Sequence, residues 1–239
     1  MARRRFFVDS VHSGHSHIAG ADAHHLTRVL RVEPGQKFEI SDNRDVYLAE
    51  IESARKDLVS FAILERIAAP EPAVNITLLA SLIKFERFEW IVEKATELGA
   101  GSIVPVEAER SERGLARAAI KRLERWKRIA REASEQSRRA RLPEVGTPID
   151  LAAALATPAD HRFVLEEEQA PGIVSVLPAQ RMAGTGVALL VGPEGGWTDR
   201  ERSSFAGAAW QSVSLGPQIL RAETAVIAGL AVLNAAWDK

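Results

Sequence analysis

A strand that ends in a glycine-rich turn, near the carboxyl end of the chain, constrains the fold more than any other feature. Residues 187–191 are apolar and β-prone, as in a strand buried on both faces. Gly192-Pro193-Glu194-Gly195-Gly196 ends that strand. Thr198 is followed by Glu201 at the spacing of a capping box, which predicts that a helix begins here.

The same pattern returns further along the chain. Val213-Ser214-Leu215 predicts a short strand, Gly216-Pro217 ends it, and Thr224 is expected to cap a final helix. Because glycine has no Cβ, two such turns side by side form a pocket lined by main-chain N–H and C=O groups. A pocket of this kind suits an adenine or an amino-acid group. The spacings of the common phosphate-binding glycine motifs are absent, and two tight turns without a ligand remain the alternative interpretation.

Composition limits the class of protein. The 239 residues are 46% hydrophobic and 26% charged, which is typical of a globular protein. Cys is absent, which excludes disulfides and thiolate metal sites and fits a reducing cytoplasm. The basic start is not followed by the apolar segment of a signal peptide, and no apolar run is long enough to span a membrane. We therefore expect a cytoplasmic protein that has no membrane partner.

The first part of the chain is rich in β-prone segments. These segments are 5–8, 37–41, 46–51 and 58–63, and residues 23–31 are more helical. The pattern predicts a small β-barrel. Pro70 and Pro72, in a polar context, mark the boundary of this domain.

Beyond the boundary, strands and helices alternate. Residues 76–82, 103–106 and 163–165 read as strands, whereas 85–98 and 224–237 read as helices. Such alternation predicts an α/β domain with a mostly parallel sheet. Glu166-Glu167-Glu168 follows the third of these strands and is interpreted as a solvated loop. The last helix is apolar nearly all round, which favours burial against a second subunit.

Basic residues are concentrated in the middle of the chain. Between Arg110 and Arg141 there are twelve Arg or Lys residues and four Asp or Glu residues, although the net charge of the chain is −1. A helix is expected over 115–136, with a basic row at four-residue steps: Arg113, Arg117, Lys121 and Arg125. A row of like charges suits a phosphate backbone, and a solvated face is the alternative.

Five of the six histidines lie in the segment from His12 to His25. They lack a supporting Cys or a clear arrangement of acidic residues, so no metal is predicted. Solvated loops and phosphate contacts are the two interpretations that remain.

The glycine turns also identify a family. The segments V-G-P-E-G-G-W-T-D-R-E (191–201) and S-L-G-P-Q-I-L-R-A-E-T-A (214–225) resemble the signature of SPOUT methyltransferases. Together with Lys84, Arg110-Ser111 and Glu135-Gln136-Ser137-Arg138, they resemble the branch that methylates uridine N3 in 16S ribosomal RNA. The resemblance covers essentially the whole chain. It departs at Gln218, where the family pattern favours a basic residue.

This resemblance implies an architecture, a cofactor and partners. It implies a PUA-like RNA-binding β-barrel over 1–70 and a SPOUT α/β domain with a trefoil knot over 74–239. The cofactor is S-adenosylmethionine, no metal is needed, and the partners are the 16S rRNA of the small ribosomal subunit and a second copy of the chain. The expected cofactor-binding residues are Leu165, Val191, Gly192, Pro193, Glu194, Gly195, Gly196, Leu215, Gly216, Ile219, Leu220, Arg221 and Thr224.

The chemistry of such an enzyme requires few groups. Loss of the uridine N3 proton places negative charge on the uracil carbonyl oxygens, which a guanidinium would stabilise. The catalytic candidates are Arg138, Arg221 and Glu194; Glu194 either serves as a base or fixes the glycine loop. The RNA-binding candidates are Arg3, Arg4, Arg28, Arg31, Arg110, Arg117, Lys121, Arg138 and Arg139. Methylation of another RNA atom, such as a ribose 2′-oxygen, and RNA binding without catalysis are the alternatives.

Overall fold

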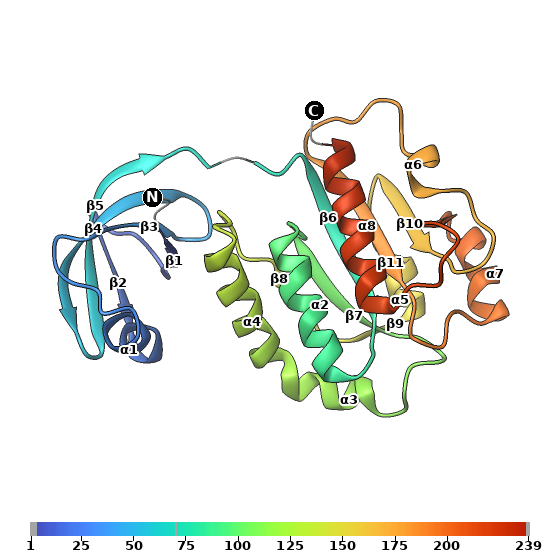
Figure 1. Cartoon of the computed structure of the whole chain (residues 1–239), viewed down its shortest axis with the longest axis horizontal. Helices are drawn as coiled ribbons and strands as arrows, with labels where there is room; N and C mark the ends of the chain where they lie inside the picture. Colours follow the sequence, from blue (N-terminus) through green and yellow to red (C-terminus); the bar gives the residue numbers. More distant parts are fainter. Residues whose placement is uncertain (1–3, 70, 238–239) are drawn as a thin grey trace. The chain divides into compact units, whose positions relative to one another are not determined.

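The computed structural model describes residues 4–69 and 71–237 (Figure 1). The chain divides into two compact units. The first comprises residues 1–70 and Ser134–Leu142, and the second comprises Glu71–Ala133 and 143–239. In the described ranges, no helix combines the length and the apolar character that a membrane crossing requires.

The first unit is built on a five-stranded sheet in the order β1-β3-β4-β5-β2. Its elements are β1 (Arg5–Phe7), β2 (His15–Ala19), α1 (Gly20–Arg28), β3 (Lys37–Ser41), β4 (Val46–Arg55) and β5 (Leu58–Ile67). β1 runs parallel to β3, and the other neighbours are antiparallel. The apolar side chains of this unit, among them Ile40 and Phe61, form a separate core. β2 is an element that the sequence pattern did not predict.

The segment Ser134–Leu142 belongs to the first unit, although the sequence-based boundaries placed it in the C-terminal domain. Arg5 donates to the carbonyl of Arg138 at 2.6 Å, and the Ser41 hydroxyl donates to the carbonyl of Ala140 at 2.6 Å. The amide of Leu142 donates to Asn43 Oδ1 at 2.7 Å. Main-chain groups of the segment therefore find their partners on the N-terminal sheet, which is why the two group together.

The second unit has a parallel sheet of seven strands. The order is β12-β10-β11-β6-β7-β8, and β9 also pairs with β7. The strands are β6 (Val74–Ser81), β7 (Ser102–Glu107), β8 (Glu144–Val145), β9 (Ile149–Asp150), β10 (His161–Leu165), β11 (Thr185–Val191) and β12 (Gln211–Val213). The expected α/β class and parallel sheet are confirmed.

Helices cover both faces of this sheet. They are α2 (Phe85–Glu97), α3 (Leu115–Ala119), α4 (Leu123–Gln136), α5 (Leu151–Leu155), α6 (Ile173–Val176), α7 (Asp199–Gly207) and α8 (Ala222–Trp237). Successive residues of β6 enter different cores, because side chains alternate along a strand. Leu78 packs with Phe88 of α2 and Leu230 of α8, whereas Leu79 packs with Phe205 of α7.

Two expectations about helices and one about a strand need correction. The helix expected over 115–136 is interrupted by a 3-10 turn at Ile120–Arg122, which separates α3 from α4. Thr224 does not cap α8, because the carbonyl of Arg221 already accepts from the amide of Ala225 and the helix begins at Ala222. The second short strand ends at Val213, two residues before its expected end.

α8 buries its main apolar stripe within its own chain. Val226, Leu230 and Leu233 are fully buried against the sheet and α2. Ile227 and Val232, outside this stripe, stay partly exposed, so burial of the helix against a second subunit stays a prediction.

Candidate active site

A pocket of about 320 Å³ opens in the second unit, beside the carboxyl ends of β10, β11 and β12. Its walls come from the segments that follow these strands, including Glu167, Gly196 and Gly216. Ligands of open α/β sheets bind at the carboxyl ends of the strands, because the loops there leave a crevice. The volume falls in the range of small-molecule sites, which is roughly 300–1,000 Å³.

The glycine turn after β11 forms one wall of this pocket. Gly196 has φ +68°, and a Cβ placed on it would lie 1.9 Å from Oε1 of Glu167. A Cβ on Gly192 would lie 3.0 Å from the indole of Trp197. Gly196 is therefore favoured by its backbone conformation, and Gly192 by the lack of space beside the buried indole. Gly195 differs: it is outside the left-handed region and is not among the residues that line the pocket.

α7 begins with the expected capping box, which is confirmed. The amide of Glu201 donates to the Thr198 hydroxyl at 3.2 Å, and the amide of Thr198 donates to Glu201 at 2.8 Å. The Glu201 carboxylate is buried, and its other oxygen accepts from the amide of Glu109 at 2.8 Å. The Thr198 hydroxyl donates in turn to the Glu109 carboxylate at 2.9 Å. One buried carboxylate thus joins the loop after β7 to the glycine turn.

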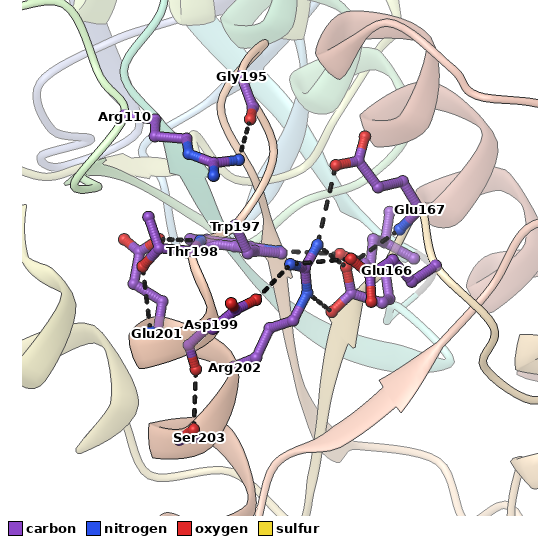
Figure 2. Close-up of polar contacts among 12 residues, drawn as sticks. Arg110, Glu166, Glu167, Gly195, Trp197, Thr198, Asp199, Glu201, Arg202 and Ser203 are labelled. Carbon is purple, nitrogen blue, oxygen red and sulfur yellow. Dashed lines mark hydrogen bonds and ion pairs between the residues drawn. The ribbon is translucent and has the colours of Figure 1, made fainter.

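Trp197 joins the glycine turn to the neighbouring strand. Its indole is fully buried, and its N–H donates to the carbonyl of Leu165 at 3.0 Å (Figure 2). Leu165 is the last residue of β10. The walls that follow β10 and β11 are therefore held together by a hydrogen bond in a water-excluded position.

The acidic triplet after β10 lies in a loop, as expected, and Glu167 and Glu168 are exposed, whereas the Glu166 side chain is buried in an ion pair. Arg202 of α7 donates to both carboxylate oxygens of Glu166, at 3.0 and 3.1 Å, and lies 3.0 Å from Glu168 (Figure 2). Its distance to Glu167 is longer, 3.8 Å. The hydrogen bond to Glu166 raises the pKa of Arg202, so this residue stays cationic. A single guanidinium compensates the repulsion among the three carboxylates.

Charges of both signs line the pocket. Arg87, in the first turn of α2, is ion-paired with Glu194 of the glycine turn. Among the residues that the structure describes, the Glu194 carboxylate accepts from the Arg87 side chain and from no main-chain N–H. Arg221 also lines the pocket, and its side chain has no ion-pair partner among the residues that the structure describes.

Most of the expected cofactor residues lie in the pocket wall. Leu165, Val191, Gly192, Pro193, Glu194, Gly196, Leu215, Gly216, Ile219, Leu220 and Arg221 line it, whereas Gly195 and Thr224 do not. Arg110 donates to the carbonyl of Gly195 at 2.7 Å (Figure 2). Lining residues that the sequence pattern missed are Arg87, Glu166, Glu167, Trp197, Gln218, Ala222 and Ala225. Trp197 lies within the glycine signature itself, so this signal was available in the sequence.

The third catalytic candidate, Arg138, is in a different place. It belongs to the segment that groups with the first unit, and its guanidinium donates to Glu39 at 2.6 Å. Glu39 also pairs with Arg5 at 2.8 Å, and these two side chains are only 10% and 7% exposed. Arg138 has φ +58°, a conformation that this network holds in place. It does not line the pocket.

The remaining RNA-binding candidates are mostly exposed. Arg4, Arg28, Arg31, Arg117 and Lys121 are on the surface, and Arg3 lies outside the described residues. Arg139 is half-buried; burial lowers its pKa to about 10, and it donates to the carbonyl of Arg141 at 3.1 Å.

Only part of the basic row is free of ion pairs within the described residues. Arg125 makes a bidentate pair with Glu89 at 2.7 and 2.8 Å, and this hydrogen bonding lowers the pKa of Glu89. Arg117 and Lys121 have no ion-pair partner within the described part of the chain. The uncompensated charge of the row therefore lies on these two residues and on Arg113, which precedes α3.

His12, His15 and His17 line a separate hollow of the first unit, where His15 pairs with Glu52 at 3.1 Å. Across residues 4–69 and 71–237, no group of three or more His, Asp or Glu side chains is arranged to hold a metal ion.

Comparison with known proteins identifies the class. Residues 70–234 match the RNA methyltransferase domain family, and residues 18–64 match the RNA methyltransferase PUA domain family. The fold and the site are therefore those of an RNA methyltransferase that carries a PUA domain.

Individual relatives narrow the class to one family. The ribosomal RNA small subunit methyltransferase E of Bacillus subtilis is 33% identical over 227 residues, which cover 91% of this chain and 88% of that protein. The protein of the same name from Synechocystis is 34% identical over 220 residues, which cover 90% of this chain and 71% of that protein. A crystal structure of this enzyme from Neisseria gonorrhoeae, bound to S-adenosylmethionine, matches with a TM-score of 0.87 and 31% identity, and covers 99% of this chain and 98% of that one. The chain belongs to the ribosomal RNA small subunit methyltransferase E family.

Proposed function

We propose that this enzyme methylates N3 of a uridine in the 16S rRNA of the small ribosomal subunit. It is an S-adenosylmethionine-dependent rRNA methyltransferase by family. The observation that carries the proposal is the pocket at the two glycine turns, which has the size and the lining that an adenosyl and an amino-acid group require.

The residues present fit this cofactor. Gly192 and Gly196 line the pocket and let the Trp197 indole and the Glu167 carboxylate lie close against the main chain of the turn. Leu215 and Leu220, on the opposite turn, supply apolar surface for an adenine ring. Glu167 and Arg221 add charged groups to the wall, which suits a cofactor that has polar as well as apolar parts.

When bound, S-adenosylmethionine supplies a methyl group already activated on its sulfonium. The side chains of this enzyme then have to orient the uracil and compensate the charge that follows loss of the N3 proton. We assign that compensation to Arg221, because it is a pocket cation without an ion-pair partner among the described residues. Glu194 is assigned to holding the glycine turn through Arg87, and Arg138 to the N-terminal network that includes Glu39.

The proposed RNA surface includes the exposed residues Arg117 and Lys121, together with the PUA unit. Cations without local partners gain most from contact with phosphate, because binding releases the counterions condensed on the RNA. Arg125 contributes less, since Glu89 already neutralises it.

Three further properties belong to the same proposal. The second unit has a trefoil knot, the active enzyme is a homodimer, and it works in the cytoplasm, where small ribosomal subunits are assembled. Ile219, 78% exposed on the turn that lines the pocket, supports an assembly in which another surface covers it.

The test is to identify the methylated nucleoside. Small ribosomal subunits and free 16S rRNA that lack the modification are incubated with the enzyme and labelled S-adenosylmethionine, then digested and separated by mass spectrometry. We expect 3-methyluridine, with Arg221→Ala much slower than the unchanged protein and Arg200→Ala, an exposed arginine that does not line the pocket, close to it. A labelled ribose 2′-O-methyl nucleoside would overturn the N3 assignment, and the absence of any label would overturn the enzymatic one.

A further inference from the structure

Glu167 follows the strand that lies next to the strand carrying the glycine turn. It lies two residues beyond the end of β10, and β10 is the parallel neighbour of β11, which carries that turn. In dinucleotide-binding folds, an acidic side chain in the same relation to a glycine turn, at the end of the adjacent parallel strand, accepts hydrogen bonds from a ribose. The topology thus places an acceptor where an adenosine ribose would be expected.

The carboxylate of Glu167 lies directly over bare main chain. Its Oε1 occupies the space that a Cβ of Gly196 would need, at 1.9 Å, and both residues line the pocket. A carboxylate in this place presents two acceptors to the pocket and has no N–H or O–H of its own. It suits a partner that has two donors side by side.

The neighbouring acidic residues leave Glu167 available. Glu166 is 5% exposed and is occupied by two hydrogen bonds from Arg202, and Glu168 also pairs with Arg202 at 3.0 Å. Glu167 is 40% exposed and is the most distant of the three from that guanidinium, at 3.8 Å. Arg202 therefore fixes the loop through the two flanking carboxylates and keeps the third near the pocket (Figure 2).

We propose that Glu167 binds the 2′- and 3′-hydroxyls of the cofactor ribose, with Arg202 as the residue that positions its loop. This inference rests on the proposed cofactor of the pocket. It deepens that proposal, because it assigns the recognition of the ribose, rather than of the amino-acid group, to a named side chain.

The experiment measures binding without turnover. S-adenosylhomocysteine and its 2′-deoxy analogue are titrated calorimetrically into the unchanged protein, Glu167→Gln and Glu168→Gln. Glu168 is the matched control, because it pairs with the same arginine but does not line the pocket. Thermal unfolding of each variant verifies that it is folded.

We expect Glu167→Gln to lower the affinity for S-adenosylhomocysteine by roughly 10- to 100-fold, which is the effect of losing a hydrogen bond to a charged group. Glu168→Gln should change this affinity little. The 2′-deoxy analogue should bind the unchanged protein more weakly, and this penalty should largely disappear in Glu167→Gln. An undiminished penalty, or unchanged affinity in Glu167→Gln, would overturn the assignment.

A third ligand separates the ribose from the ammonium. 5′-Methylthioadenosine keeps the ribose but lacks the amino-acid group, so Glu167→Gln should also lower the affinity for this ligand. If only S-adenosylhomocysteine is affected, Glu167 binds the ammonium and the ribose assignment is wrong. If the unchanged protein binds neither adenosyl ligand, the proposed cofactor fails, and the ribose assignment fails with it.

Discussion

Replacement of Gly196 by Ala tests whether the bare main chain of the glycine turn is needed for the ligand. Gly196 is held at φ +68°, where an L-residue costs about 1–2 kcal/mol, and the smaller entropy of the unfolded Ala chain offsets about 0.4–1 kcal/mol of this. The expected loss of unfolding free energy is therefore about 1 kcal/mol. For a chain of this size, that corresponds to a fall of about 2–4 °C in the melting temperature.

The effect of Gly196→Ala on the pocket should be larger than its effect on stability. The new Cβ would lie 1.9 Å from Oε1 of Glu167, so that carboxylate has to move away from the wall. We expect the affinity for S-adenosylhomocysteine to fall at least about 10-fold, the effect of losing one hydrogen bond to a charged group. Calorimetric titration and thermal unfolding measure the two quantities on the same sample.

The adjacent glycine provides the control. Gly195→Ala introduces the same methyl group at a residue that is outside the left-handed region and does not line the pocket, where it meets Cβ of Arg110 at 3.3 Å, so only a shift of a few tenths of an ångström is needed. It should leave the affinity within about 3-fold of the unchanged protein, which is below 1 kcal/mol. Normal binding by Gly196→Ala, or equal losses in both variants, would refute this account of the turn.

Other residues give three further predictions. Glu39→Ala leaves Arg5 buried without its partner and should lower the unfolding free energy by about 3–5 kcal/mol, measured by denaturant titration; addition of Arg5→Met should recover much of the loss, and no recovery would contradict the buried-charge explanation. Thr198→Ala removes the cap of α7 and should cost about 0.5–2 kcal/mol in the same assay, so an unchanged value would mean that the cap contributes nothing. Arg117→Ala with Lys121→Ala should reduce the slope of log affinity for 16S rRNA against log salt concentration by about 1.4–1.8, with no change in S-adenosylhomocysteine binding; an unaltered slope would mean that this face is only solvated.

Local sequence patterns predicted the parts of the site that depend on neighbouring residues. The glycine turns and the capping box of Thr198 are specified within a few positions, so their geometry follows from the backbone needs of those positions. Thr224 shows the limit of such reasoning. It was expected to cap α8, but the helix already begins at Ala222, where the carbonyl of Arg221 accepts from the amide of Ala225. β2 was missed because its sequence, His-Ser-His-Ile-Ala, does not alternate clearly between apolar and polar residues. In the structure, its residues nevertheless alternate between exposed and buried.

Partners distant in the sequence could not be predicted. Nothing near Glu166 indicates that Arg202 will neutralise the acidic triplet, and nothing near Arg138 indicates that Glu39 will bind it. Each acidic residue has many candidate cations in a chain with 31 Lys and Arg residues, and only the folded sheet selects one. The assignment of Arg138 to catalysis rested on a motif, and motifs do not specify which unit a segment joins.

The grouping of Ser134–Leu142 with the first unit has a consequence for biosynthesis. Domains generally fold from the amino terminus as the chain is made. Here the carbonyl of Ala140 and the amide of Leu142, which bond to the end of β3 and to the loop after it, are synthesised long after the sheet that receives them. The N-terminal unit therefore cannot reach its final structure on the ribosome until residue 142 has emerged, by which point more than half of the chain has been translated. A fragment that stops at the proline boundary would contain all five strands of the sheet and still be incomplete.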